Sequence, residues 1–175
     1  MARGMTLIEL VLVVVIVGAI AAFVGPMLST ALEAYDTTEA STATYGKMRY
    51  ALERMAREIR EVRRSAADTA NFDISAMTAT TLTFVKNDAQ QVTIAYPAGT
   101  GTVTVNYVAV ASGVLTDTVN EAPAAPCVTG FRYFQQSGAV GATAATVSFV
   151  EIGLTLREGT NDYCNRLRVD LRSPQ

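Results

Sequence analysis

An unbroken run of apolar residues from Leu10 to Leu28 constrains the fold of this chain more than any other feature. The run has no charged side chain and contains only aliphatic residues, phenylalanine, methionine, two glycines and one proline. As a helix it is long enough to cross the hydrocarbon core of a bilayer. A single carboxylate, Glu9, stands directly before it. An acidic side chain in a membrane helix is costly and is a functional candidate by default, so the question is which cation Glu9 meets.

The composition excludes several classes of function. The chain has 175 residues, which suits one compact domain plus an extension. The formal net charge of −2 gives no argument for nucleic-acid binding. There is no histidine, which removes Ser-His-Asp and Cys-His catalysis and imidazole metal sites. Since no carboxylate pair or cofactor motif stands out either, we expect a protein that is not an enzyme and needs no cofactor.

The N-terminus has the features of an uncleaved signal anchor. The apolar run exceeds the about 7–15 residues of a secretory signal peptide, and no small-residue cleavage site of the A-x-A type follows it. Arg3 and the free amino group put positive charge before the run. Residues after Leu28 are therefore expected on the far side of the membrane.

Gly4 followed by Met5-Thr6-Leu7-Ile8-Glu9-Leu10 resembles the class III signal of type IV prepilins and pseudopilins, G-[F/M]-T-L-I-E-L. The resemblance implies that a prepilin peptidase cuts after Gly4 and methylates the new terminus at Met5. It also implies that Glu9 promotes filament assembly by meeting the terminal amine of a neighbouring subunit. Such a cation would relieve a carboxylate that costs roughly 2.5–3.5 kcal/mol at mid-bilayer. Met5 stands where the family usually has phenylalanine, and the leader is very short.

Gly25 and Pro26 lie inside the apolar run. Proline in a helix removes one backbone hydrogen bond and clashes with the preceding turn, so this pair predicts a gentle kink. In the resembled family, a proline here also lets the helix loosen when subunits pack into a filament.

Residues 29–65 are expected to continue the helix. Apolar residues recur at steps of three and four, which predicts a stripe that packs against a sheet: Tyr45, Met48, Leu52, Met55, Ile59 and Val62. Around the stripe, Glu53–Arg57 and Arg57–Glu61 have the spacing of helix-surface ion pairs. The basic excess here indicates either a face that contacts DNA or lipid, or a solvated face that can meet acidic neighbours; we prefer the second because basic residues suit a helix C-terminus. A helix from residue 6 to 65 would span roughly 90 Å at ~1.5 Å per residue, which suits a filament.

Residues 66–175 are expected to form a β-rich head. Alternating patterns and turn residues predict strands at 81–86, 91–96, 102–111, 128–135, 146–157 and 167–171. A long helix, transmembrane in one half and amphipathic in the other, packed on an antiparallel sheet is an α+β arrangement. The resemblance implies the same class, the pilin fold. The segments 51–60, 128–133 and 147–156 are similar to minor pilins, to J-type pseudopilins and, for the helix, to the MSHA O-type minor pilins.

Cys127 and Cys164 lie far apart and outside any CxxC spacing. In an exported domain, a structural disulfide between them is the preferred interpretation. An oxygen-rich turn with Asp117, Asn120 and Glu121, and a second turn at 158–162, carry side chains of the type that binds calcium. Calcium takes about six to eight oxygen ligands, so we predict no metal site.

Together these features predict a structural subunit, a minor pilin or pseudopilin, with a leader at 1–4, a transmembrane and assembly helix at 5–28, its amphipathic continuation at 29–65 and a head at 66–175. The expected location is the bacterial inner membrane, single-pass with the head in the periplasm, and then the pilus or pseudopilus. The implied partners are prepilin peptidase, other pilin subunits, the inner-membrane assembly platform and membrane lipid, with no nucleic acid expected. Three alternatives stay open: a type II secretion pseudopilin, a membrane-anchored periplasmic binding module and a DNA-uptake subunit.

Overall fold

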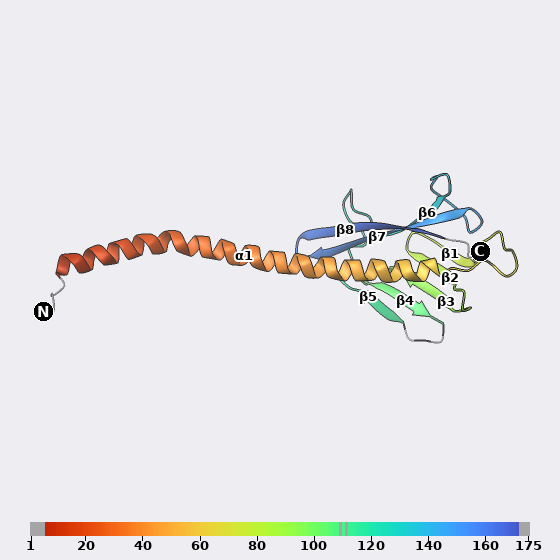
Figure 1. Cartoon of the computed structure of the whole chain (residues 1–175), viewed down its shortest axis with the longest axis horizontal. Helices are drawn as coiled ribbons and strands as arrows, with labels where there is room; N and C mark the ends of the chain where they lie inside the picture. Colours follow the sequence, from red (N-terminus) through yellow and green to blue (C-terminus); the bar gives the residue numbers. More distant parts are fainter. Residues whose placement is uncertain (1–5, 109, 111, 172–175) are drawn as a thin grey trace. The chain divides into compact units, whose positions relative to one another are not determined.

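The computed structural model describes residues 6–108, 110 and 112–171 (Figure 1). One long helix, α1 (Leu7–Arg60), is followed by strands that form antiparallel sheets, so the predicted α+β class is confirmed. The chain divides into two compact units, Met1–Thr42 and Ala43–Gln175. We call the second unit the head; it contains the last part of α1 in addition to the β-rich residues 66–175.

In the first unit, α1 is helical without interruption through Gly25 and Pro26. Proline has no N–H to donate, so the carbonyl of Ala22 lacks its usual helical partner. The proline therefore weakens the helix locally but does not end it.

In the head, strands that follow one another in the chain also pair with one another, in a sheet of five strands and a sheet of three. The first sheet contains β1 (Ile74–Met77), β2 (Thr81–Val85), β3 (Gln91–Ala95), β4 (Val103–Tyr107) and β5 (Gly113–Thr116). The second contains β6 (Gly130–Gln135), β7 (Val147–Glu158) and β8 (Asn161–Asp170).

The predicted hairpin is confirmed, because β2 and β3 pair from Thr81↔Ala95 to Val85↔Gln91. Two four-residue strands, β1 and β5, were not predicted. The last strand, β8, is much longer than the predicted 167–171 and pairs with β7 along its whole length. The division into two sheets is likewise a finding of the structure.

One hydrophobic core joins the helix to both sheets. Five members of the predicted stripe are buried: Met48, Leu52, Met55, Ile59 and Val62. They pack in a cluster with side chains from the first sheet, such as Phe84 and Ile94, and from the second, such as Ile152. Tyr45 is the exception at 53% exposed, and its ring meets that of Tyr163 edge-on at 5.3 Å.

The helix ends at Arg60, so its predicted extension to residue 65 is wrong. After Arg60 the backbone becomes extended and joins the strands. The Arg63 N–H donates to the Val85 carbonyl (3.0 Å), and the Asp73 N–H donates to the Arg63 carbonyl (2.9 Å). Hydrogen bonds to neighbouring segments thus replace those that a further helical turn would make.

The two predicted helix-surface pairs are replaced by others. Glu53 pairs with Arg49 at 2.7 Å and Glu61 pairs with Lys86 at 2.7 Å, in place of Arg57. The Arg49–Glu53 pair is a local i, i+4 pair on the same helix, whereas the pair of Glu61 with Lys86 is a tertiary contact.

Candidate functional site

The carboxylate of Glu9 lies at the start of α1, where it forms a capping box with Thr6. The Thr6 N–H and the Thr6 hydroxyl both donate to Glu9 Oε2 at 3.2 Å, and the Glu9 N–H donates to Thr6 Oγ1 at 3.4 Å. A Thr-x-x-Glu pair of this kind satisfies N–H groups that the first helical turn leaves without partners.

This geometry lowers the free-energy cost expected for the Glu9 carboxylate next to an apolar segment. The residue lies in the first turn of α1 rather than in the middle of the apolar segment, and the helix dipole favours a negative charge there. Both hydrogen bonds from Thr6 go to Oε2, so Oε1 accepts none in the part of the chain that the structure describes. The motif T-x-x-E before an apolar run was readable from the sequence as a capping box and was missed.

The predicted processing residues, Gly4 and Met5, lie outside the described residues. The apolar segment that follows them has no buried side chain: Leu7 is 81% exposed and Phe23 is 80% exposed. By length and composition, α1 is able to cross a membrane. Its first half is therefore an apolar surface that finds no cover within its own unit.

After Pro26, hydroxyl side chains bond back to the backbone of α1. Each donates to a carbonyl three or four residues earlier, at 2.7 to 3.0 Å: Ser29, Thr30, Thr37, Thr38, Ser41 and Thr42. These hydroxyls have partners inside their own helix, as is common for Ser and Thr in helices.

A buried charge cluster ties the end of α1 to the first sheet. Glu58 is 3% exposed and pairs with Arg54 at 2.8 Å and with Lys86 at 3.2 Å. The Tyr107 hydroxyl donates to Glu58 Oε1 at 2.7 Å and accepts from Arg54 at 2.7 Å. The hydrogen bond to Glu61 raises the pKa of Lys86, and partial burial raises the pKa of Tyr107. Every member has a partner, so the cluster fixes the helix on the sheet.

A second charged cluster crosses the three-stranded sheet. Arg132, Glu151 and Arg168 are cross-strand partners on β6, β7 and β8. Glu151 lies 3.5 Å from Arg132 and 3.2 Å from Arg168, whose guanidinium also covers the Phe134 ring at 4.1 Å. No sequence pattern predicts this cluster, since its members come from three separate strands.

The predicted disulfide between Cys127 and Cys164 is confirmed. It joins the segment before β6 to β8 and holds that segment against β7. There the Thr155 hydroxyl donates to the Val128 carbonyl at 3.2 Å. A Cβ on Gly153 would lie 2.7 Å from the same carbonyl oxygen, so the close approach requires glycine.

The oxygen-rich turn considered for calcium sends its side chains to different partners. Asp117 pairs with Lys47 at 3.3 Å, and Asn120 donates to Asp162 at 2.9 Å. Glu121 accepts from the N–H groups of two glycines, and these hydrogen bonds lower its pKa. No group of three metal-ligating side chains occurs among the described residues.

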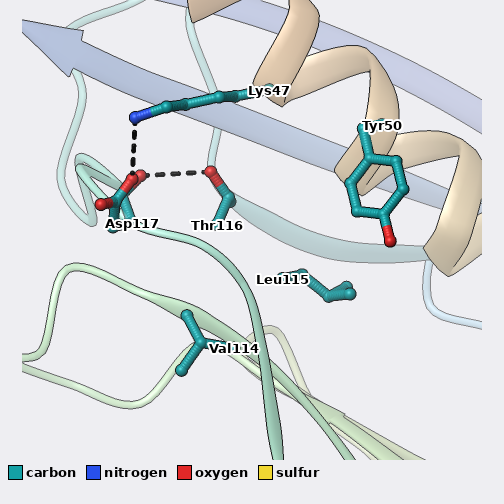
Figure 2. Close-up of a pocket in the computed structure, with 6 residues that line it drawn as sticks. All are labelled: Lys47, Tyr50, Val114, Leu115, Thr116 and Asp117. Carbon is teal, nitrogen blue, oxygen red and sulfur yellow. Dashed lines mark hydrogen bonds and ion pairs between the residues drawn. The ribbon is translucent and has the colours of Figure 1, made fainter.

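A hollow of about 490 Å³ lies between α1 and the edge strand β5 (Figure 2). Figure 2 shows Tyr50 reaching it from the helix and Val114 and Leu115 from the strand, with the Lys47–Asp117 ion pair at one side. Tyr50 and Val114 are each 63% exposed, so apolar surface remains open to solvent here.

Most of the basic residues predicted as a possible DNA- or lipid-contacting face have partners within the head. Arg49, Arg54 and Arg63 form ion pairs with acids, and the guanidinium of Arg64 lies 3.9 Å from the Phe72 ring centre. Arg57 and Arg60 are exposed, and no ion pair involves either of them in the described ranges. The exposed charge that this face keeps outside ion pairs of the described residues is therefore small.

No protein-family model matches the chain, and no curated protein matches it. The chain is an α+β protein with an N-terminal helix long and apolar enough to span a membrane and with a disulfide-bonded β head. This arrangement fits a pilin-like, membrane-anchored protein.

Proposed function

We propose that this chain is a structural subunit of a type IV pilus-like filament, a minor pilin or a pseudopilin. It is inserted in the bacterial inner membrane with its head in the periplasm, trimmed after Gly4 by a prepilin peptidase and methylated at Met5. Assembly-platform proteins and other pilin subunits are its partners. It has no catalytic role.

One observation carries the proposal: a single helix combines an apolar first half, exposed on every side, with a second half that buries one apolar stripe in a β head. A helix that is apolar all round needs cover from lipid or from other helices. A filament of packed helices supplies that cover after the subunit leaves the bilayer. The disulfide agrees with a periplasmic head, because disulfides persist in oxidising compartments.

In this proposal Glu9 acts through its free oxygen. Cleavage after Gly4 creates an amino terminus at Met5, directly before Thr6, the N-cap of α1. Thr6 holds Glu9 Oε2, which leaves Oε1 to accept a hydrogen bond from the terminal amine of the next subunit. The contact would be a charge-assisted hydrogen bond in a site of low dielectric, where such bonds are strong.

The test is the intact mass of the full chain made with and without prepilin peptidase. We expect a product that begins at Met5 and carries one additional methyl group, only when the peptidase is present. A Gly4→Leu variant is the control and should keep its leader. A wild-type chain that still begins at Met1 beside active peptidase would overturn the proposal.

A second candidate is a membrane-anchored periplasmic binding module, and the capping box favours it. Helix capping by itself gives Glu9 a role, so an anchor without a filament also accounts for this residue. Glu9→Gln separates the two, because glutamine retains the capping geometry and removes the charge. Normal membrane insertion with loss of filaments supports the filament subunit, whereas filaments that persist in Glu9→Gln contradict the role of Glu9.

A pilus subunit and a type II secretion pseudopilin would use the same features of this chain and differ in the assembly platform that they meet. Co-expression with each assembly platform, followed by electron microscopy of sheared filaments, would assign it.

A further inference from the structure

Strand β5 leaves one edge of the five-stranded sheet open. The sheet ends at β5, whose only partner strand is β4. In the described part of the chain, no backbone group of Gly113–Thr116 bonds to any other segment. An open strand edge presents N–H and C=O groups that fit the backbone of a further extended segment.

The other strand edges of the head are covered, charged or not apolar. At β6, the Gln135 N–H donates to the Ala139 carbonyl at 2.9 Å, so the following chain covers that edge. On β8, the Arg166 N–H donates to the Asn165 side chain at 2.8 Å, and charged residues recur along the strand. Charged residues on an edge oppose the addition of a strand. The remaining edge strand, β1, exposes no large apolar side chain. Since β5 has no charged residue, it is the edge that is both open and apolar.

The hollow of about 490 Å³ between β5 and α1 lies directly beside this edge (Figure 2). Tyr50 lines it from the helix, and Val114 and Leu115 both line it from the strand. Consecutive residues of a regular strand point to opposite faces, but the register of β4 and β5 shifts here and leaves Leu115 without a partner on β4. The volume lies within the about 300–1,000 Å³ of ligand pockets, so it can hold side chains of an added strand.

Exposed apolar side chains of the head concentrate near β5. Four of them are between 59% and 63% exposed: Tyr50, Val108, Val110 and Val114. Val108 and Val110 lie in the connection from β4 to β5, where polar turn residues are usual. Elsewhere in the described head, Tyr45 and Val140 are the only large apolar side chains that are exposed. An exposed concentration of this kind marks an interaction surface.

The helix side of the hollow carries positive charge. One face of α1 presents residues at i, i+3, i+7 and i+10: Lys47, Tyr50, Arg54 and Arg57. Lys47 meets Asp117 just after β5 at 3.3 Å, and Arg54 donates to the Tyr107 hydroxyl at the end of β4 at 2.7 Å. This face therefore runs alongside the β4–β5 hairpin. The Lys47 side chain is 53% exposed, and Arg57 is exposed with no ion pair in the described ranges.

We propose that the edge of β5 and the adjoining hollow, together the β5 groove, bind an extended acidic segment of a partner protein. The segment adds to the sheet as a strand beside β5, and every second side chain faces α1. In that row an apolar side chain fills the hollow against Tyr50 and Leu115. Acidic side chains two residues before and after it meet Lys47 and Arg57. This inference concerns the head alone and does not depend on the filament function.

Backbone pairing and side-chain contacts have separate roles in this groove. The backbone edge selects an extended partner, because a helix or a lipid surface offers no row of N–H and C=O groups. Since β5 has only four residues, backbone pairing alone would be weak, and the apolar side chain in the hollow must add affinity. Lys47 and Arg57 select the charge of the partner, since complementary rim charges give specificity more than affinity.

The first experiment adds two peptides to the full chain in detergent micelles. The probe is acetyl-Thr-Glu-Thr-Val-Thr-Glu-Thr-amide, and the control peptide has lysine in place of both glutamates. The probe is expected to bind and to slow amide hydrogen exchange in Gly113–Thr116 several-fold, whereas the control peptide should do neither. Absence of binding, equal binding of the two peptides, or binding that leaves these amides unprotected would each overturn the inference. Protection of the same amides that rises with protein concentration and needs no peptide would assign the edge to a second copy and also overturn it.

The second experiment changes the groove. Tyr50→Ser and Arg57→Glu are each expected to weaken binding of the probe by about fivefold, and Arg57→Glu should strengthen binding of the lysine peptide. Both positions are exposed, so the head should stay folded, which circular dichroism checks. Arg166→Glu is the matched control, because it reverses an exposed charge on the other sheet and should bind the probe as the wild type does. An equal loss in Arg57→Glu and Arg166→Glu would show unspecific attraction and contradict the β5 groove.

Discussion

The two halves of α1 are parts of one helix, yet they differ in how their apolar side chains are covered. From Leu7 to Leu28 apolar residues occupy every side and no side chain is buried. From Met48 to Ile59 one apolar stripe is buried in the head, and the exposed side carries charged residues and Tyr50. A narrow stripe can be covered by sheets of the same chain, but a helix that is apolar on every side needs lipid or other helices around it. The width of the apolar face therefore indicates whether a helix finds its partner inside or outside its own chain.

The largest expected contrast comes from the same substitution made in both halves. Leu52 is 3% exposed and Leu12 is 59% exposed. Leu52→Ala should lower the free energy of unfolding of the head by about 2–5 kcal/mol, since it leaves a cavity. Leu12→Ala should leave that free energy unchanged. Urea denaturation of the full chain in detergent, followed by near-ultraviolet circular dichroism, measures the free energy of unfolding of both variants. Equal decreases in the two variants would contradict the contrast between the two halves of α1.

The disulfide should stabilise the head without affecting the first half of α1. Cys127 and Cys164 are 37 residues apart, and closing a loop of that size contributes roughly 3–4 kcal/mol through the unfolded chain. The Cys127→Ser/Cys164→Ser variant should lose that amount in the same urea experiment and remain fully in the membrane fraction. Wild-type protein that unfolds at the same urea concentration with and without reductant would contradict this prediction.

Alkaline pH should destabilise the head. Burial raises the pKa of Tyr96 and of Tyr133 well above the ordinary 10.0. Above pH 10 these phenols lose their protons in the unfolded state but keep them in the folded state. The unfolded state then binds fewer protons, so stability falls by up to about 1.4 kcal/mol per pH unit for each group.

Deprotonation of Lys86 should also destabilise the head at alkaline pH. Its pKa is raised by hydrogen bonds to Glu61 and Glu58, so its stabilising contribution is complete below its ordinary value of 10.5 and is lost as pH rises through the folded-state pKa. Stability measured between about pH 7 and pH 12 should fall less steeply in Tyr96→Phe than in the wild type. Parallel profiles would show that Tyr96 is not the group responsible.

The smallest expected effect concerns the start of α1. Thr6→Ala removes the N-cap and should destabilise the first turn by about 1 kcal/mol. Amide hydrogen exchange near Leu10 in detergent should become several-fold faster, while head stability stays unchanged. Thr37→Ala is the matched control, because its hydroxyl donates to the Glu33 carbonyl inside the helix and caps no helix end. Equal changes in the exchange rate for the two substitutions would contradict the role of Thr6 as the N-cap of α1.

Local patterns in the sequence predicted the elements that local forces determine. The β2–β3 hairpin follows from alternation on either side of a short polar turn, and the buried stripe from Met48 to Ile59 follows from helical spacing. The capping box of Thr6 and Glu9 was equally local. Its T-x-x-E spacing lies within one helical turn, so no tertiary contact is needed to form it.

Long-range contacts account for what the sequence could not predict. Glu58 looks like one of several charged residues on the helix surface, and its burial depends on Lys86 and Tyr107 from the first sheet. The helix end likewise depends on backbone partners near Val85 and Asp73. The four-residue β5 has too few residues to show a period, and its pairing with β4 defines it.

The back-bonded hydroxyls between Ser29 and Thr42 give this part of α1 an unusual freedom of environment. Each of these groups keeps its hydrogen-bond partner wherever the helix goes, because the partner is a carbonyl of the same helix. Transfer from water to a dry helix–helix contact therefore leaves none of these Ser and Thr hydroxyls unsatisfied. The solvent preference of the segment is then governed by Glu33, Asp36 and Glu39. Neutralising these three charges would lower the free-energy cost of removing this segment from water, toward that of the apolar helix before it.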